Sequence, residues 1–159
     1  MRIVIDTDVM LSGLQSPTGA SRLILAAALE RKITVLESVA TMIEHEAVLK
    51  RPEHLARASL DAGDIDTFLD IWAAIAEPVT IHYSWRPSVT DPDDDKFADL
   101  AVNGAADVLL TFNLRDYRPS DPSTRSAIFL CRPGVFSRRL PWRPSPDTLS
   151  GSLIRSWRK

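Results

Sequence analysis

The first eight residues, MRIVIDTD, constrain the fold more than any other stretch of this chain. The uninterrupted apolar run from Ile3 to Ile5 is typical of a strand buried on both faces of a parallel sheet. Carboxylates follow at once, because Asp6 and Asp8 come directly after this run. In open α/β sheets, ligands bind beyond the carboxyl ends of the strands. The pattern therefore favours a functional role for Asp6 over the alternative, in which Asp6 only caps a helix.

The rest of the chain alternates between strand-like and helix-like stretches. A helix that begins at Gly19 or Ser21 and runs to about Arg31 is predicted from its apolar spacing. It lies between the first run and a second one, Ile33 to Leu36, and this order predicts a parallel sheet. The predicted class is α/β, with a central parallel sheet of about four to five strands flanked by helices in three layers. The other expected elements are a turn over Ser12 to Gly19, helices from Ser38 or Thr41 to Pro52, from Glu53, from Asp64 to Pro78 and from Asp91 to Gly104, short strands over Thr80 to His82, Val108 to Leu110 and Ile128 to Leu130, and irregular structure from Pro133.

Length and composition indicate one folded domain. A chain of 159 residues with 45 % hydrophobic content is long enough to bury a full core. The single Cys131 excludes an internal disulfide and fits a reducing compartment. No apolar run approaches the roughly 20 residues of a membrane helix, and the start lacks the pattern of a signal peptide. We therefore expect a soluble, cytoplasmic protein.

Charge is distributed unevenly along the chain. Residues 132–159 contain seven basic residues and one acidic residue, whereas the preceding residues contain twelve basic and twenty acidic ones. This split predicts a folded domain over residues 1–137 and a basic, proline-rich tail over residues 138–159. Basic side chains suit the phosphates of a nucleic acid, although a solvated surface charge is the alternative for any single arginine. The first candidates for phosphate contacts are Arg115, Arg138 and Arg139.

Acidic residues stand at four predicted strand ends or helix starts. Parallel strands end at one edge of a sheet, so acids far apart in sequence can converge there, where they would repel one another. A divalent cation removes this repulsion, and oxygen ligands suit Mg²⁺ or Mn²⁺. Such ions can activate water for phosphodiester hydrolysis. The four positions are Asp6 with Asp8, Glu44, the cluster over residues 91–95, and Asp116.

Structural interpretations compete with the metal site. Asp91 suits the N-cap of a helix, and the helix dipole favours acids in a first turn by about 0.3–1 kcal/mol each. Four aspartates in residues 91–95 exceed that need. For Glu44 the alternative is a solvent-facing helix residue. A zinc site is not expected, since no ligand spacing relates His45, His54 and His82.

The order of four motifs resembles the PIN-domain ribonucleases, in particular the branch of toxins from toxin–antitoxin pairs. The motifs are DTDV, the helix in which Glu44 precedes VLKRP, DPDDDKFADLA and LLTFNLRDY, and the resemblance covers roughly residues 1–137. It implies an endoribonuclease that uses Mg²⁺ or Mn²⁺, is usually dimeric and is neutralised by a partner antitoxin. By motif position it implies metal binding and catalysis by Asp6, Glu44, Asp94 and Asp116, with support from Asp8, Asp91, Asp95, Thr111 and Asn113.

Two positions depart from the usual family pattern. Asp8 stands where the family usually has Asn, and Asn113 stands where many members have Asp, so the fourth acid would come from Asp116. Within the aspartate cluster, the spacing to Asp91 and Ala101 favours Asp94, with Asp93 and Asp95 as the alternatives.

Two other functions compete with the ribonuclease. An apolar strand followed by D-x-D also opens the haloacid-dehalogenase-type phosphatases, in which the first Asp is the nucleophile. No later lysine and acidic pair stand in a convincing order for that family. The second alternative is a non-catalytic PIN-like module that binds protein or RNA, and the departures at Asp8 and Asn113 keep this alternative open.

Overall fold

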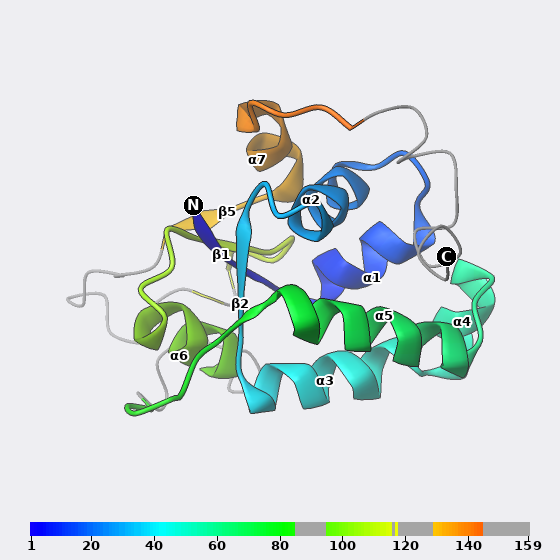
Figure 1. The fold of residues 1–159 in the computed structure, drawn as a ribbon, viewed down its shortest axis with the longest axis horizontal. Coiled ribbons are helices and arrows are strands. Elements are labelled where there is room, and N and C mark those ends of the chain that lie inside the picture. The colour runs from blue at the N-terminus through cyan, green and yellow to red at the C-terminus, as the bar shows by residue number, and fades with distance from the viewer. Residues whose placement is uncertain (85–94, 116, 118–128, 145–159) are drawn as a thin grey trace.

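A computed structural model describes residues 1–84, 95–115, 117 and 129–144 of the chain. Its centre is a five-stranded sheet in the order β3-β2-β1-β4-β5, and all four neighbouring pairs are parallel (Figure 1). The predicted α/β class with a central parallel sheet is therefore confirmed. The strands are β1 (Arg2–Ile5), β2 (Thr34–Glu37), β3 (Glu77–Pro78), β4 (Val108–Leu110) and β5 (Leu130–Cys131).

Helices cover both faces of the sheet and complete three layers. Their bounds in the described residues are α1 (Thr7–Gln15), α2 (Ala20–Leu29), α3 (Val39–Leu49), α4 (Pro52–Ala58), α5 (Ala62–Ile75), α6 (Asp95–Asn103) and α7 (Pro133–Arg139). Figure 1 shows α6 on one side of the sheet, with α1, α2, α5 and α7 on the other. Within the described part of the chain, no helix is long and apolar enough to cross a membrane.

The alternation of side chains along each strand builds two separate cores. Ile3 and Ile5 face the larger core with α1, α2, α5 and α7, whereas Val4 faces the smaller core around α6. The same division separates Val108 and Leu110 from Leu109. Successive strand residues point to opposite faces, so a strand covered on both faces must be apolar throughout. This explains why β1 and β4 are continuous apolar runs.

Three sequence predictions of local structure are wrong, each for a physical reason. The expected turn from Ser12 begins only after Gln15, because α1 buries Val9, Met10 and Leu14 in the larger core. The expected irregular segment after Pro133 is α7, since proline is well suited to the first position of a helix and Phe136 is buried.

The third error concerns the edge strand. It lies at Glu77–Pro78 instead of Thr80 to His82, because its partner β2 ends at Glu37, which pairs with Pro78. The predicted helix start at Asp91 lies outside the described residues, and so does Ile128 of the predicted last strand.

The strand order creates a switch point between β1 and β4. From β1 the chain moves through α1 and α2 to β2 on one side, and later returns through α6 to β4 on the other side. In open α/β sheets, ligands bind beyond the carboxyl ends of the strands at a reversal of the strand order. Asp6 follows β1 and Thr111 follows β4, so both residues lie at this switch point.

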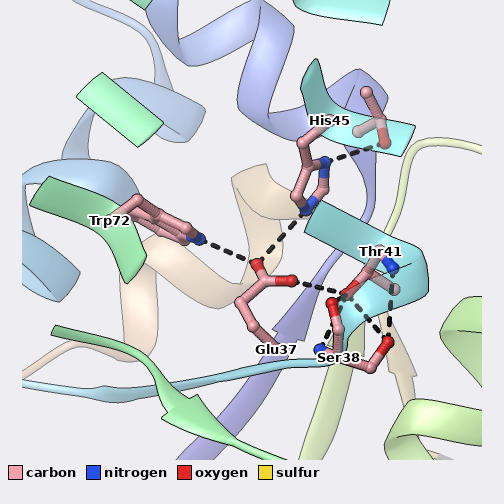
Figure 2. Close-up of polar contacts among 6 residues, drawn as sticks. Glu37, Ser38, Thr41, His45 and Trp72 are labelled. Atoms are coloured by element: carbon pink, nitrogen blue, oxygen red, sulfur yellow. Dashed lines mark hydrogen bonds and ion pairs between the residues drawn. The ribbon is translucent and has the colours of Figure 1, made fainter. Parts of the chain in front are cut away.

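A buried polar network holds the start of α3 in place, at the carboxyl end of β2 (Figure 2). Ser38 caps the helix by accepting a hydrogen bond from the Thr41 backbone N–H at 3.2 Å, and the Thr41 hydroxyl accepts one from the Ser38 N–H at 2.9 Å. This reciprocal pattern is a capping box. Ser38 and Thr41, the two residues at which the sequence predicts that this helix could begin, therefore both take part in the capping box.

The centre of the network is the carboxylate of Glu37, which is only 5 % exposed. Its Oε1 accepts a hydrogen bond from Trp72 Nε1 at 2.7 Å and lies 3.2 Å from His45 Nε2, while Oε2 accepts from the Thr41 hydroxyl at 2.6 Å. A buried carboxylate is tolerated when both oxygens have donors. The network therefore joins the end of β2 to α3 and α5.

We expect Gly13→Ala to destabilise the protein, because α1 and α2 approach closely at this position. A Cβ on Gly13 would lie 2.5 Å from Leu25 Cδ1 and 3.1 Å from the Ser21 carbonyl oxygen. Overpacking of this kind typically costs about 1–3 kcal/mol of unfolding free energy. The matched control is Gly134→Ala in α7, where a Cβ meets nothing within 4 Å. Urea unfolding of both variants checks the prediction, which fails if the two changes have the same sign.

We expect Trp72→Phe to lower the unfolding free energy by about 1–3 kcal/mol, because Glu37 loses a hydrogen-bond donor. The smaller side chain should lower the unfolding free energy by a further amount, because it leaves a cavity. Denaturant unfolding of Trp72→Phe, Glu37→Gln and the double variant measures the effect. Because the two side chains are hydrogen-bonded, their effects should not add. Additivity to within about 0.5 kcal/mol would contradict the proposed contact energy.

Candidate functional site

Among the described acids, Asp6 lies at the switch point between β1 and β4. It directly follows β1, is 8 % exposed and donates its backbone N–H to the Leu110 carbonyl at 3.0 Å. Its Oδ2 accepts hydrogen bonds from the Thr111 hydroxyl at 2.8 Å and from the Tyr117 hydroxyl at 3.1 Å. The carboxylate is therefore held in one orientation by residues that follow β4.

The hydroxyl of Thr111 is itself oriented. It is fully buried and accepts a hydrogen bond from the Asn113 backbone N–H at 3.0 Å while it donates to Asp6. A hydroxyl has one proton to donate and can accept at the same time. The contribution of Asn113 to this arrangement comes from its backbone, which any residue except proline could supply.

Burial raises the pKa of Asp6 above the ordinary value of 3.8. The Thr111 hydrogen bond acts in the opposite direction, the negative charge of Asp8 raises the pKa further, and the Tyr117 hydrogen bond lowers it. Asp8 is exposed in the first turn of α1. Because desolvation and a like charge both disfavour the ionised form, a cation beside Asp6 would lower the free energy of the carboxylate.

The second predicted acid, Glu44, lies in α3 and is brought toward this edge by its neighbour His45. His45 is fully buried, and its Nδ1 lies 2.9 Å from the Thr7 hydroxyl, directly after Asp6 in the chain. The His45 ring also packs on Phe97 of α6, with ring centroids 5.6 Å apart. These two contacts place α3 against both the start of α1 and α6.

Glu44 forms an ion pair with α6. Its Oε2 lies 3.2 Å from Lys96 Nζ, and the two side chains are 34 % and 23 % exposed. Glu44 is therefore part-exposed, and its carboxylate also contacts a neighbouring helix. The ion pair connects the second acidic motif to the third.

The aspartate cluster is described only in part. Asp95, in the first turn of α6, is 2 % exposed, and Asp99 one turn later is 4 % exposed and accepts a hydrogen bond from the Ser84 hydroxyl at 2.7 Å. The predicted site residues Asp91, Asp94 and Asp116 lie outside the described residues, as does the alternative Asp93.

The described candidate ligands, Asp6 and Glu44, fit a hard divalent cation because both offer carboxylate oxygens. In addition, burial and the charge of Asp8 disfavour the ionised form of Asp6, which a cation would stabilise. Within residues 1–84, 95–115, 117 and 129–144, no group of three His, Cys, Asp or Glu side chains is close enough to hold a metal ion. A complete ligand set would therefore need acids from the remaining positions, to which Asp94 and Asp116 belong.

The candidate phosphate-binding arginines lie in two places. Arg115 is exposed in the turn after β4, two residues before Tyr117. Arg138 and Arg139 are exposed in the last turn of α7, which packs on α2.

Sequence reasoning missed four residues around this edge: Tyr117, Lys96, Glu37 and His45. Tyr117 directly follows Asp116. Glu37 directly follows a predicted strand, as Asp6 does, so its position after a strand is a signal that the sequence contains. Nothing in the sequence pairs Lys96 with Glu44, which are 52 positions apart. His45 was judged only as a metal ligand, and its contacts are instead with Thr7 and Glu37.

Comparison with known proteins identifies the family. No curated protein and no solved structure gave a significant match to the chain. A family model for the PIN domain matches residues 2–115, which contain Asp6, Glu44 and the aspartate cluster. Members of this family are generally nucleases, and they typically use divalent metal ions. Since the match covers more than half of the sequence, this chain belongs to the PIN-domain family.

Proposed function

We propose that this protein is an endoribonuclease that depends on Mg²⁺ or Mn²⁺. The observation that carries the proposal is the buried carboxylate of Asp6 at the switch point, oriented by Thr111 and Tyr117 and destabilised by burial and by Asp8. A carboxylate placed in this way suits metal binding, since the cation offsets the cost of burying the charge. Membership in a nuclease family supports the same role.

Asp6 and Glu44 would hold the metal, together with Asp94 and Asp116. When bound, a divalent cation supplies an activated water and stabilises the leaving oxygen of a phosphodiester. Thr111 and Tyr117 keep the Asp6 carboxylate in place, so Asp6 does not have to reorganise when substrate arrives. Arg115, Arg138 and Arg139 would contact the phosphates of the RNA backbone.

We extend the proposal to the biological role on the resemblance alone. The protein would be the toxin of a toxin–antitoxin pair, act in the cytoplasm as a homodimer and be neutralised by a partner antitoxin. The helix α5 is a candidate dimer surface, which residues other than the fully buried Trp72 would have to form. Light scattering of the purified protein would give the oligomeric state.

We expect Asp6→Asn to lower cleavage of mixed-sequence single-stranded RNA by on the order of 10²–10³, as is usual for the loss of one preorganised electrostatic group. The measurement is a gel assay of purified protein with Mg²⁺, Mn²⁺ or EDTA. The matched control is Asp107→Asn, because Asp107 immediately precedes β4 and therefore lies at the opposite edge of the sheet. A folded, active Asp6→Asn variant would falsify the assignment.

The same assay separates the competing functions. Metal binding by calorimetry without cleavage of any RNA would favour the non-catalytic binding module. Turnover of a small phosphoester, with phosphate trapped on Asp6, would favour the phosphatase.

We also expect Asp6 to make the metal-free protein less stable at neutral than at acidic pH. Its pKa is raised in the folded state, so the unfolded chain releases this proton first, and stability falls as pH rises from 3.8 through the folded-state pKa. Asp6→Asn should therefore be more stable than the wild type at pH 7 in EDTA, and this advantage should vanish near pH 4.

Thermal unfolding at the two pH values, with and without Mn²⁺, checks this. A metal that binds the folded state raises the melting temperature of the wild type. Mn²⁺ should raise the melting temperature of Asp6→Asn much less. An equal rise in the melting temperature of both proteins would exclude Asp6 as a ligand.

A further inference from the structure

The ammonium of Lys96 forms an ion pair with Glu44, one of the acids that the proposed function requires. Its Nζ lies 3.2 Å from Glu44 Oε2, across the contact between α6 and α3. The pair is part-buried, with Lys96 23 % and Glu44 34 % exposed. Both helices are held in place independently of this ion pair, because His45 of α3 packs on Phe97 of α6.

The surroundings of the Lys96–Glu44 ion pair differ from those of Lys50, whose ion pairs are also described. Lys50 contacts Glu46 at 2.7 Å and Asp66 at 2.5 Å, and both of these acids are more than half exposed. Lys96, in contrast, is preceded directly by the buried Asp95 and lies in the first turn of α6. An ammonium in this position counters the charge of an acidic edge.

We propose that Lys96 is a tethered cation with two partners: it neutralises Glu44 in the metal-free protein, and it binds a substrate phosphate when a divalent metal takes Glu44. The inference rests on the proposed function. Glu44 cannot serve the ammonium and the metal equally well, so metal binding weakens the ion pair. The released lysine is a flexible point charge, which is well suited to a phosphate oxygen.

The physical consequence is that Lys96 acts in opposite directions on the two ligands. Its charge repels a divalent ion and competes for the same carboxylate oxygen, so it weakens metal binding. The same charge attracts the nucleic-acid backbone, so it strengthens RNA binding. A residue that only stabilised the fold would affect both ligands in the same direction.

The test uses Lys96→Met in the full chain, with Lys50→Met as the matched control for loss of one lysine charge. Calorimetry with Mn²⁺ alone should show binding about two- to fivefold tighter than in the wild type, the range expected for one partly exposed ion pair. Binding of a labelled single-stranded RNA in Ca²⁺ should be weaker, and the slope of log affinity against log salt should shrink by about 0.7, the value for one phosphate contact. Gel analysis after each titration verifies that the RNA is intact.

Two further variants complete the design. Lys96→Arg keeps the charge and should restore the wild-type salt slope, and Lys96→Gln gives a second neutral side chain if the methionine variant unfolds. Lys50→Met should change neither the Mn²⁺ affinity nor the salt slope by a comparable amount.

Each result decides the proposal. Tighter Mn²⁺ binding together with weaker RNA binding in Lys96→Met supports the proposal. Weaker binding of both ligands, or no change in either affinity, overturns it and leaves the nuclease assignment intact. A wild type that binds neither Mn²⁺ nor RNA overturns the proposed function and, with it, the role of Lys96.

Discussion

The placement of α3 beside the start of α1 depends on one buried interaction, the carboxylate of Glu37 with its three donors. Burying a charge is costly unless its oxygens are paired, so the side chains that supply the donors must keep their positions. Trp72 ties Glu37 to α5, and Thr41 and His45 tie it to α3. His45 then contacts Thr7, next to Asp6. A structural acid at the end of β2 thereby positions the helix that carries a candidate functional acid.

Three acids at this edge have three different environments, and these separate their roles. Glu37 receives donors on both carboxylate oxygens, which suits a structural position. Asp6 receives two hydroxyls on Oδ2, and burial together with Asp8 still raises its pKa. Glu44 is balanced by the charge of Lys96. Asp6 would gain from a divalent cation, and Glu44 would have to give up Lys96 to join it, so the proposed metal site is built on these two acids.

Much of the fold could be predicted because the strands are covered on both faces. The apolar runs at Ile3 to Ile5 and Val108 to Leu110 identify β1 and β4 directly, and the helical spacing between strands requires a parallel sheet. The errors occurred where propensity and packing disagree. Ser12 and Gly13 have turn-like character, but the apolar surface that α1 buries outweighs it. The prolines from Pro133 onward predict irregular structure, yet Pro133 begins α7.

The sequence by itself determined that Asp6 ends a buried strand, since an apolar run followed by a carboxylate has this meaning in any parallel sheet. It also determined the family, through motifs whose order survives without coordinates. Only the tertiary structure decided which side chains meet. The partners Thr111 with Asp6 and Lys96 with Glu44 are separated by 105 and 52 positions. Their contacts follow from strand order and helix packing, and local sequence carries no record of either.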